Sequence, residues 1–75
     1  MDIRIKLANN ARYFREQLGL SQEAVAIKIG ADRAYVSLIE RGKQNMTLVR
    51  LAELADALGV DATDLIAAPK EPEQD

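Results

Sequence analysis

The sequence predicts an all-α domain, built as a compact bundle of five short helices. Apolar residues recur with the period of a helix, glycines interrupt them, and no segment alternates with the period of two that marks a strand. Of the 75 residues, 48% are apolar, which suits a single globular domain with a small core. We expect this domain to span residues 1–68, and the charged, apolar-free residues 69–75 to form a disordered acidic tail.

The first helix is predicted from about residue 3 to residue 18. Leu7, Ala11, Phe14 and Leu18 recur at i, i+4, i+7 and i+11, so they form one apolar stripe along such a helix. Gly19 follows directly, and glycine commonly ends a helix because it adopts the left-handed conformation without strain.

Two shorter helices joined by a tight turn follow the first helix. Ser21 is a preferred N-cap for one segment, Gly30 ends that segment, and Asp32 caps the next. Short helices joined this closely must cross steeply, and the small side chain of Ala26 leaves room for the approach. We expect these helices at about residues 22–29 and 33–41.

The last two helices also begin at capping residues. Thr47 caps a helix that runs to Leu58, and Asp61 caps a short helix at about 62–67, with Asp64 as its capping-box partner. The apolar stripe of the fourth helix comprises Leu48, Leu51, Ala52, Ala55 and Leu58. Beyond the first helix, the expected core residues are Val25, Ala26, Ile29, Val36, Ile39, Leu51, Ala55 and Leu58.

The charges are unevenly distributed along the chain. The net charge of −2 by itself argues weakly against a nucleic-acid partner. However, residues 1–43 carry eight basic and five acidic side chains, whereas residues 44–75 carry two basic and seven acidic ones. This asymmetry indicates one basic and one acidic face, although ordinary solvated surface charge is the alternative explanation.

Several classes of function lack support in the sequence. The chain has no cysteine, no histidine and no glycine-rich phosphate loop, so we expect no enzyme activity and no metal or cofactor. No apolar run approaches the length of a membrane span, and no signal-peptide pattern opens the chain. We therefore expect a cytoplasmic protein without a membrane segment, and no small-molecule ligand is evident.

Several motifs together point to one family. They are Leu18-Gly19-Leu20-Ser21-Gln22, Ala26, Gly30, Val36-Ser37, Ile39-Glu40-Arg41-Gly42 and Leu58-Gly59-Val60. With them, about residues 5–67 resemble the Cro/repressor-type (XRE) helix-turn-helix family. The resemblance implies a five-helix domain that binds double-stranded operator DNA as a homodimer and regulates transcription. Many members carry Asn-Pro-Thr before the fourth helix, where this chain has Asn45-Met46-Thr47, so the loop loses a rigid φ restraint.

Within the family, one hexapeptide narrows the resemblance. Asp32-Arg33-Ala34-Tyr35-Val36-Ser37 looks most like the controller proteins of restriction-modification systems, which are stand-alone domains of about this length. An antitoxin, or another protein-interaction module that uses the same fold, is the alternative, because fold does not imply function.

The resemblance places the third helix in the major groove, with its first residues at the base edges. The candidate base-reading residues on its outer face are Arg33, Ala34, Ser37 and Leu38. Arg33 can bond O6 and N7 of guanine together, and the alternatives are a phosphate contact or no contact. Leu38 either packs on a thymine methyl group or packs against the edge of the second helix.

Other polar side chains are candidate phosphate contacts, which position a protein without reading bases. They are Gln22, Tyr35, Lys43, Gln44, Asn45 and Arg15. Tyr35 is open to two further interpretations, stacking on Arg33 or structural packing. The resemblance also implies that Arg15 and Glu40 tie the first helix to the third as an ion pair, which would present Arg15 to phosphate.

A two-fold operator requires a protein surface that pairs with a second copy. Some apolar residues fall off the core stripes, or lie in the C-terminal part of the domain. The candidate dimer residues are Val49, Val60, Leu65 and Ile66. A symmetric dimer would place its two third helices about 34 Å apart, one turn of DNA.

Overall fold

Five helices follow one another in the computed structural model, which describes residues 2–68. They are α1 (Ile3–Gln17), α2 (Gln22–Ile29), α3 (Arg33–Glu40), α4 (Leu48–Leu58) and α5 (Ala62–Ile66). No strand occurs within residues 2–68, so the predicted all-α architecture is confirmed. The predicted helices end within one residue of the observed bounds. The tail predicted at residues 69–75 lies outside the described residues.

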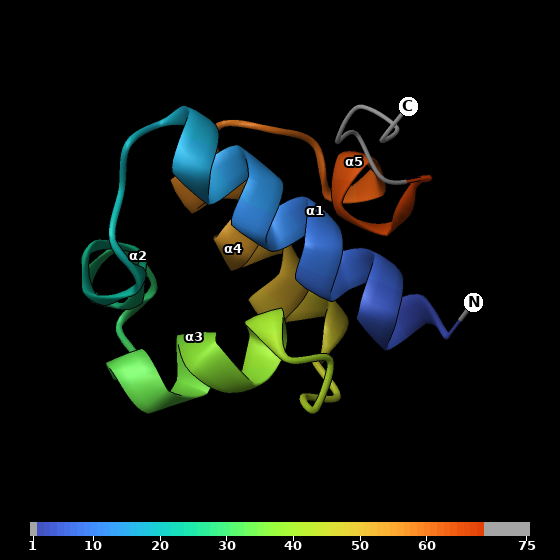
Figure 1. The fold of residues 1–75 in the computed structure, drawn as a ribbon, viewed down its shortest axis with the longest axis horizontal. Helices are drawn as coiled ribbons and strands as arrows, with labels where there is room; N and C mark the ends of the chain where they lie inside the picture. Colours follow the sequence, from blue (N-terminus) through green and yellow to red (C-terminus); the bar gives the residue numbers. More distant parts are fainter. Residues whose placement is uncertain (1, 69–75) are drawn as a thin grey trace, which may run out of the picture.

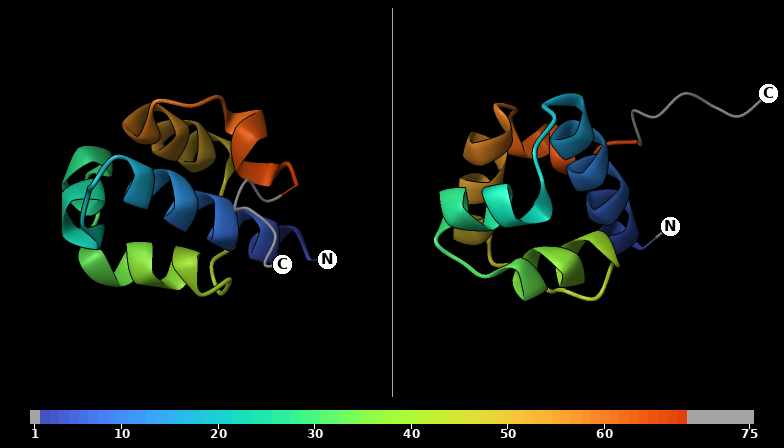
Figure 2. Two further views of the ribbon diagram at one scale, coloured as in Figure 1. Left: turned by 45° about the horizontal axis from the view of Figure 1, so that its top comes forward. Right: turned by 60° about the vertical axis from the view of Figure 1, so that its left-hand side comes forward.

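The long helix α1 lies through the middle of the bundle (Figure 1). It packs against α3 on one side and against α4 and α5 on the other, as Figure 2 shows from a second direction. The helix α2 closes one end by packing on α3 and α4. In this arrangement α3 lies along one edge of the molecule, opposite α5.

Side-chain caps set the starts of the helices. The predicted N-caps Ser21, Asp32 and Thr47 accept hydrogen bonds from the backbone N–H groups of Ala24 (3.0 Å), Tyr35 (2.9 Å) and Arg50 (3.1 Å). The capping box of Asp61 and Asp64 is also present. One cap was not predicted: Asp2 caps α1 and accepts a hydrogen bond from the backbone N–H of Arg4 at 2.8 Å.

The core differs from the predicted stripes at the ends of two helices and within α4. Leu18 is 53% exposed and Leu48 is 83% exposed, although both were expected on buried faces. Leu18 is the C-cap that follows α1 and Leu48 is the first residue of α4, so both lie at helix ends, where periodicity alone misplaced them. The buried core residues are Leu7, Ala8, Ala11, Val25, Ala26, Ile29, Val36, Ile39, Leu54, Ala55, Leu58 and Leu65. In α4, Leu54 takes an inward position, Leu51 is only partly buried and Ala52 is exposed.

One polar side chain is completely buried and fastens α5 to α1. Asn10 is 0% exposed, and its Nδ2 donates to the carbonyl oxygens of Leu65 (3.0 Å) and Ala67 (2.9 Å). Its Oδ1 is buried without a hydrogen-bond partner among the described residues. Asn10 was not predicted as a buried residue, although its place three residues after Leu7 puts it on the buried stripe of α1.

The loop after α3 begins at a glycine that closely approaches α1. Gly42 has φ +71°, and a Cβ atom there would lie 2.5 Å from Cδ1 of Ile5. Glycine is therefore required here for two reasons: it adopts the left-handed backbone conformation without strain, and it has no Cβ atom to collide with Ile5. This approach sets where the polar loop at 43–45 leaves α3, beside the start of α1.

Candidate nucleic-acid interface

The turn between α2 and α3 is held by backbone contacts. Gly30 has φ +69°, and the N–H of Ala31 donates to the carbonyl oxygen of Ala26 at 2.9 Å. Ala26 is only 1% exposed, which confirms its predicted place in the core. The turn thus orients α3 so that Val36 and Ile39 face the core and the opposite side is open.

The structure places the four candidate base-reading residues on the side of α3 away from the core. Arg33 and Ala34 are exposed, whereas Ser37 and Leu38 are half-buried. Arg33 is the first residue of α3, so its side chain lies at the end of the helix that is expected at the base edges. Their contacts with bases stay a prediction.

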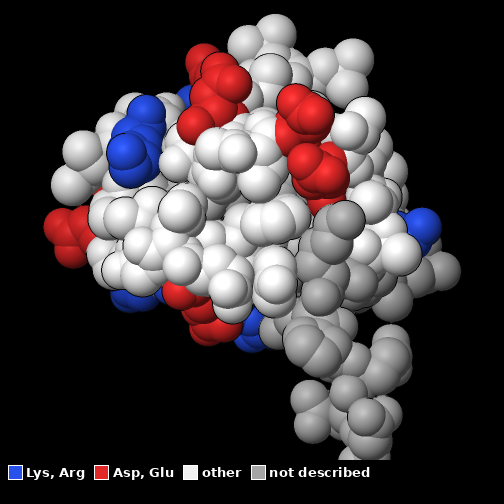
Figure 3. Space-filling model, turned by 90° about the horizontal axis from the view of Figure 1, so that it is seen from above, with Lys and Arg blue, Asp and Glu red and all other residues white. Residues whose placement is uncertain are grey.

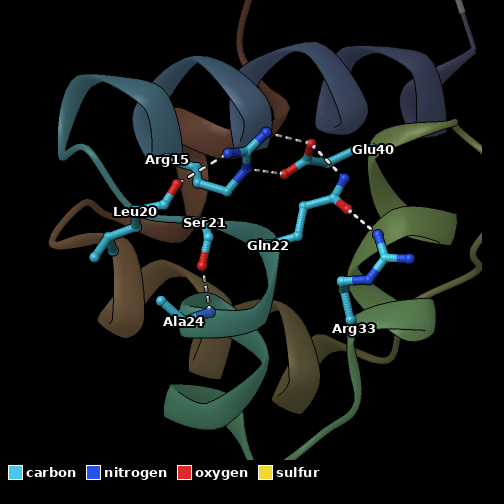
Figure 4. A network of polar contacts seen from close by, with 7 residues as sticks. All are labelled: Arg15, Leu20, Ser21, Gln22, Ala24, Arg33 and Glu40. Carbon is cyan, nitrogen blue, oxygen red and sulfur yellow. Dashed lines mark hydrogen bonds and ion pairs between the residues drawn. The ribbon is translucent and has the colours of Figure 1, made fainter.

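A chain of polar contacts connects α1, α2 and both ends of α3 (Figure 4). Nη1 of Arg33 donates to Oε1 of Gln22 at 3.1 Å, and Nε2 of Gln22 donates to Oε1 of Glu40 at 3.2 Å. Arg15 completes the chain, because its Nε and Nη2 donate to Oε2 and Oε1 of Glu40 at 2.6 and 3.0 Å. We call these four side chains the Arg15–Arg33 network.

The ion pair expected between Arg15 and Glu40 is confirmed, and it is largely shielded from solvent. The side chain of Arg15 is 15% exposed and that of Glu40 is 5% exposed. The hydrogen bonds to Glu40 raise the pKa of the Arg15 guanidinium above its ordinary value. Nη1 of Arg15 also donates to the carbonyl oxygen of Leu20 at 2.9 Å, so all three nitrogens have acceptors within the protein. A phosphate contact by Arg15 stays a prediction.

Tyr35 has a structural role that involves a different arginine from the one expected. Its half-buried ring packs against the core, and the guanidinium carbon of Arg50 lies 5.0 Å from the ring centroid. The Nη1 of Arg50 also donates to the carbonyl oxygen of Ile29 and to Oε1 of Glu53, both at 2.8 Å. The structural role of Arg50 was not predicted. Its spacing of three residues from Glu53, which is typical of an ion pair along a helix, was the signal in the sequence that could have indicated it.

The loop after α3 supplies the remaining candidate phosphate contacts. Lys43 and Asn45 are exposed, and the half-buried Gln44 donates from Nε2 to the carbonyl oxygen of Asn45 at 3.3 Å. This loop continues the edge of the molecule along which α3 lies (Figure 1). The structure therefore brings the loop and α3 onto one face, and Gln22 reaches the same face through its contact with Arg33.

The charges fall on different sides of the molecule. Exposed Arg33, Arg41 and Lys43 lie on or just after α3, whereas Glu53, Asp56, Asp61 and Asp64 lie on or between α4 and α5. Figure 3 shows the face turned away from α3, where acidic side chains are prominent. The edge formed by α3 and its loop is accordingly the more favourable side for a polyanion.

The candidate dimer residues do not all lie at the surface. Leu65 is 0% exposed, so it belongs to the core of this chain, and its expected place in a dimer surface is corrected. It points inward because α5 is docked on both α1 and α4. Val49 is 69% exposed, and Val60 and Ile66 are half-buried.

An apolar hollow lies where α4 begins and α5 ends. It has a volume of about 230 Å³ and is lined by Ile3, Arg4, Leu7, Gln44, Asn45, Met46, Leu48, Leu51 and Ile66. Leu48 was not predicted to lie at the surface, because the helical spacing of apolar residues placed it on the buried stripe of α4. The hollow and the exposed Val49 put apolar surface on the start of α4.

Two other features, a cluster of metal ligands and a membrane-spanning helix, are absent from the part of the chain that the structure describes. Within residues 2–68, no group of three or more acidic side chains is placed to hold a metal ion. In the same part of the chain, no helix is both long enough and apolar enough to cross a membrane.

Comparison with known proteins identifies the family. A family model described as "Helix-turn-helix" matches residues 12–65, which include α2, α3 and the turn between them. The chain belongs to this helix-turn-helix family. The resemblance to Cro/repressor-type proteins is thereby confirmed.

Named relatives of this helix-turn-helix protein include regulators and controller proteins. A hypothetical transcription factor of Neisseria meningitidis serogroup B is 46% identical over 93% of the chain, which spans 66% of that relative. Control protein C.MunI of a Mycoplasma species is 40% identical over 88% of the chain and 90% of its own length.

Solved structures of named proteins have the same fold. The hypothetical transcription factor NHTF from Neisseria superposes with a TM-score of 0.87 at 45% identity, over 92% of this chain and 79% of that one. The restriction-modification controller protein C.AhdI from Aeromonas hydrophila gives 0.78 at 40% identity, over 83% and 94% of the two chains.

Proposed function

We propose that this helix-turn-helix protein is a cytoplasmic, sequence-specific transcription regulator that binds operator DNA as a homodimer. In this proposal α3 enters the major groove and Arg33 reads a guanine. The observation that carries it is the state of the Arg33 side chain, which is exposed at the first position of α3 and anchored through one nitrogen.

The anchoring of Arg33 is best understood beside that of Arg15. In Arg15, Nη1 bonds a carbonyl oxygen, while Nε and Nη2 together bond the two oxygens of Glu40. In Arg33, Nη1 donates to the side-chain oxygen Oε1 of Gln22, but within residues 2–68 no acceptor meets Nε and Nη2. The O6 and N7 atoms of guanine are two such acceptors, and a fork of this kind gives about 1–3 kcal/mol of discrimination between bases.

Contacts to phosphate would come from the residues that flank α3. Exposed Lys43 and Asn45 lie beyond its last residue, and Gln22 lies beside its first. Such contacts set the register of the helix on DNA and make affinity fall with salt. The acidic helices α4 and α5 would then point away from the phosphates.

The homodimer would form through the start of α4 and the end of α5. Leu48 and Val49 are 83% and 69% exposed, and Ile66 lines the adjacent hollow. Burying such apolar groups against a second copy gains about 25 cal/mol for each Å² removed from water. Val60, which is half-buried, would lie at the margin of this surface.

The names of the relatives support a narrower role as a restriction-modification controller protein. C.MunI and C.SmaI of Serratia marcescens are 40% and 41% identical to this chain, each over 88% of it. We extend their named role to this protein as part of the proposal.

Selection from a pool of random duplexes at low salt tests the proposed function. We expect the wild type to enrich a two-fold site, and Arg33→Ala to lose preference at one base position in each half-site. Lys43→Ala should weaken all duplexes alike and lower the salt slope by about 1. Lys28→Ala is the matched control, because Lys28 lies beside Asp56 and Ala57 of α4, and it should bind like the wild type. If no site is enriched, the DNA-binding proposal is wrong and a protein partner becomes the better hypothesis.

A further inference from the structure

We propose that Glu40 is a positioning residue for base recognition. Its carboxylate determines which end of the Gln22 amide faces Arg33, and thereby holds the Arg33 guanidinium in the orientation that reads guanine. This inference rests on the proposed function, and it adds a residue that lies at the opposite end of α3 from the base-reading residue.

The first step is the fixed state of Glu40. An ionised carboxylate only accepts hydrogen bonds, so any group that bonds it must present a donor. Arg15 binds both carboxylate oxygens, and the Glu40 side chain is 5% exposed. The carboxylate therefore neither rotates freely nor turns into solvent.

The second step is the orientation of the Gln22 amide. This group has a donor end, Nε2, and an acceptor end, Oε1, and the two differ little in shape. With Nε2 donating to Glu40, Oε1 is left to accept from Arg33. The reverse orientation would place Oε1 against a carboxylate oxygen and an NH₂ group against a guanidinium. Both contacts would be repulsive, so the charge of Glu40 selects the observed orientation.

The third step concerns what Arg33 gains. A free arginine side chain on a surface has many rotamers, and ordering it on binding costs free energy. The bond from Nη1 to Gln22 restrains the guanidinium before DNA arrives, with Nε and Nη2 facing away from Gln22. Because Oε1 of Gln22 is a hydrogen-bond acceptor, it restrains a donor group such as the Arg33 guanidinium at the first position of α3. It would not restrain an acceptor group at that position in the same way.

The network joins residues far apart in the sequence. Gln22 lies 18 residues from Glu40 and 11 from Arg33. The chain of contacts runs from α1 through the last residue of α3 to the first residue of α2, and then to the first residue of α3 (Figure 4). The ion pair that joins α1 to α3 is thereby connected to the base-reading end of α3.

Two variants break this connection at different points. Gln22→Met removes the amide and leaves the ion pair of Arg15 with Glu40 intact. Glu40→Gln keeps the shape but removes the charge, so both orientations of the Gln22 amide become compatible with its neighbour. Arg15→Lys is the matched control, because a lysine ammonium still pairs with the Glu40 carboxylate and restrains it, although with fewer hydrogen bonds and some loss of stability. The charge of Glu40, which selects the orientation of the Gln22 amide, is unchanged in this variant.

The readout is the ratio of Kd values for duplexes with and without the guanine that Arg33 reads, beside the same ratio at a second base position. We expect Gln22→Met and Glu40→Gln to lower the guanine ratio about 3- to 10-fold, the net effect of one hydrogen bond, with the second ratio unchanged. The double variant should lose no more than Gln22→Met alone, because both changes act through one contact. Arg15→Lys should weaken all duplexes alike and keep both ratios.

NMR of the Arg33 Nε–H group in the free protein provides a second readout that does not require DNA. We expect an ordered side chain in the wild type and in Arg15→Lys, and a mobile one in Gln22→Met and Glu40→Gln. If Glu40→Gln leaves both the order of Arg33 and the guanine ratio unchanged, the proposal for Glu40 is overturned. If Arg33 loses order in these variants but the wild type enriches no DNA site, the positioning role stands and the proposed function fails. Should Glu40→Gln not fold, Gln22→Met decides, because an unchanged Arg33 in that variant also overturns the proposal.

Discussion

Replacing Asn10 by alanine tests whether one buried amide fastens α5 to the bundle. Asn10→Ala removes the donors to the carbonyl oxygens of Leu65 and Ala67. The neighbouring Asn9→Ala is the matched control, since it makes the same chemical change one position along α1, at a side chain that is only half-buried. Any gain in helix propensity is common to both variants and cancels in the comparison.

The expected cost follows from the contacts of Asn10. A buried polar group left without a partner costs about 1–3 kcal/mol. Leaving both carbonyl oxygens without a donor therefore costs about 3 kcal/mol in total, because the oxygen of Ala67 is partly hydrated in the variant. The small cavity adds about 1 kcal/mol. Removal of the unpartnered Oδ1 returns about 2 kcal/mol, which leaves a net loss of about 2 kcal/mol. In a domain of this size that loss corresponds to a fall in Tm of about 10 °C.

Urea unfolding followed by circular dichroism measures this difference. We expect Asn10→Ala to lower the midpoint without changing the slope, and Asn9→Ala to unfold like the wild type. Hydrogen exchange should also quicken in α5, which loses the hydrogen bonds from Asn10 that fasten its end to α1. Free energies of unfolding that agree within about 0.5 kcal/mol for the two variants would refute the role given to Asn10.

Two further predictions concern the surface and the acid stability of the protein. Val49→Asp should shift sedimentation towards the monomer. Ile27→Asp is the control and should not, because Ile27 is about as exposed as Val49 (73% against 69%) but lies on α2, away from the proposed dimer surface. Equal sedimentation of the two variants would contradict the dimer surface. The hydrogen bonds from the side chain and backbone of Arg4 lower the pKa of Asp2 below 3.8, so its contribution to stability is present above that pH and is lost as the pH falls through the lower folded pKa. Asp2→Asn should remove this part of the acid dependence in urea unfolding, and an unchanged pH profile would argue against it.

The local pattern of the chain predicted the helices because their signals act over a few residues. Ser21, Asp32 and Thr47 each cap a backbone N–H three residues away, so their roles are visible in the sequence. The apolar stripes predicted most of the core but failed for Leu18, Leu48 and Ala52. Periodicity tells which face of a helix turns inward and does not tell which positions on that face the other helices cover.

The candidate site was predicted in part. The family resemblance led to Arg33 and to the ion pair of Arg15 with Glu40, and the structure contains that pair. Gln22 was expected only as a phosphate contact, and its bridge between Glu40 and Arg33 was not foreseen. Its partners lie 11 and 18 residues away, and nothing in the local pattern marks them.

The sequence by itself determined the number and approximate bounds of the helices, the caps of the last four and the residue at the start of α3. Only the tertiary structure decided that Leu65 is core, that Asn10 holds α5, that Tyr35 faces Arg50, and that Gln22 faces both Glu40 and Arg33. The physical reason is the range of the interactions. Caps and turns depend on neighbours along the chain, whereas burial and side-chain partners depend on how the five helices pack in space.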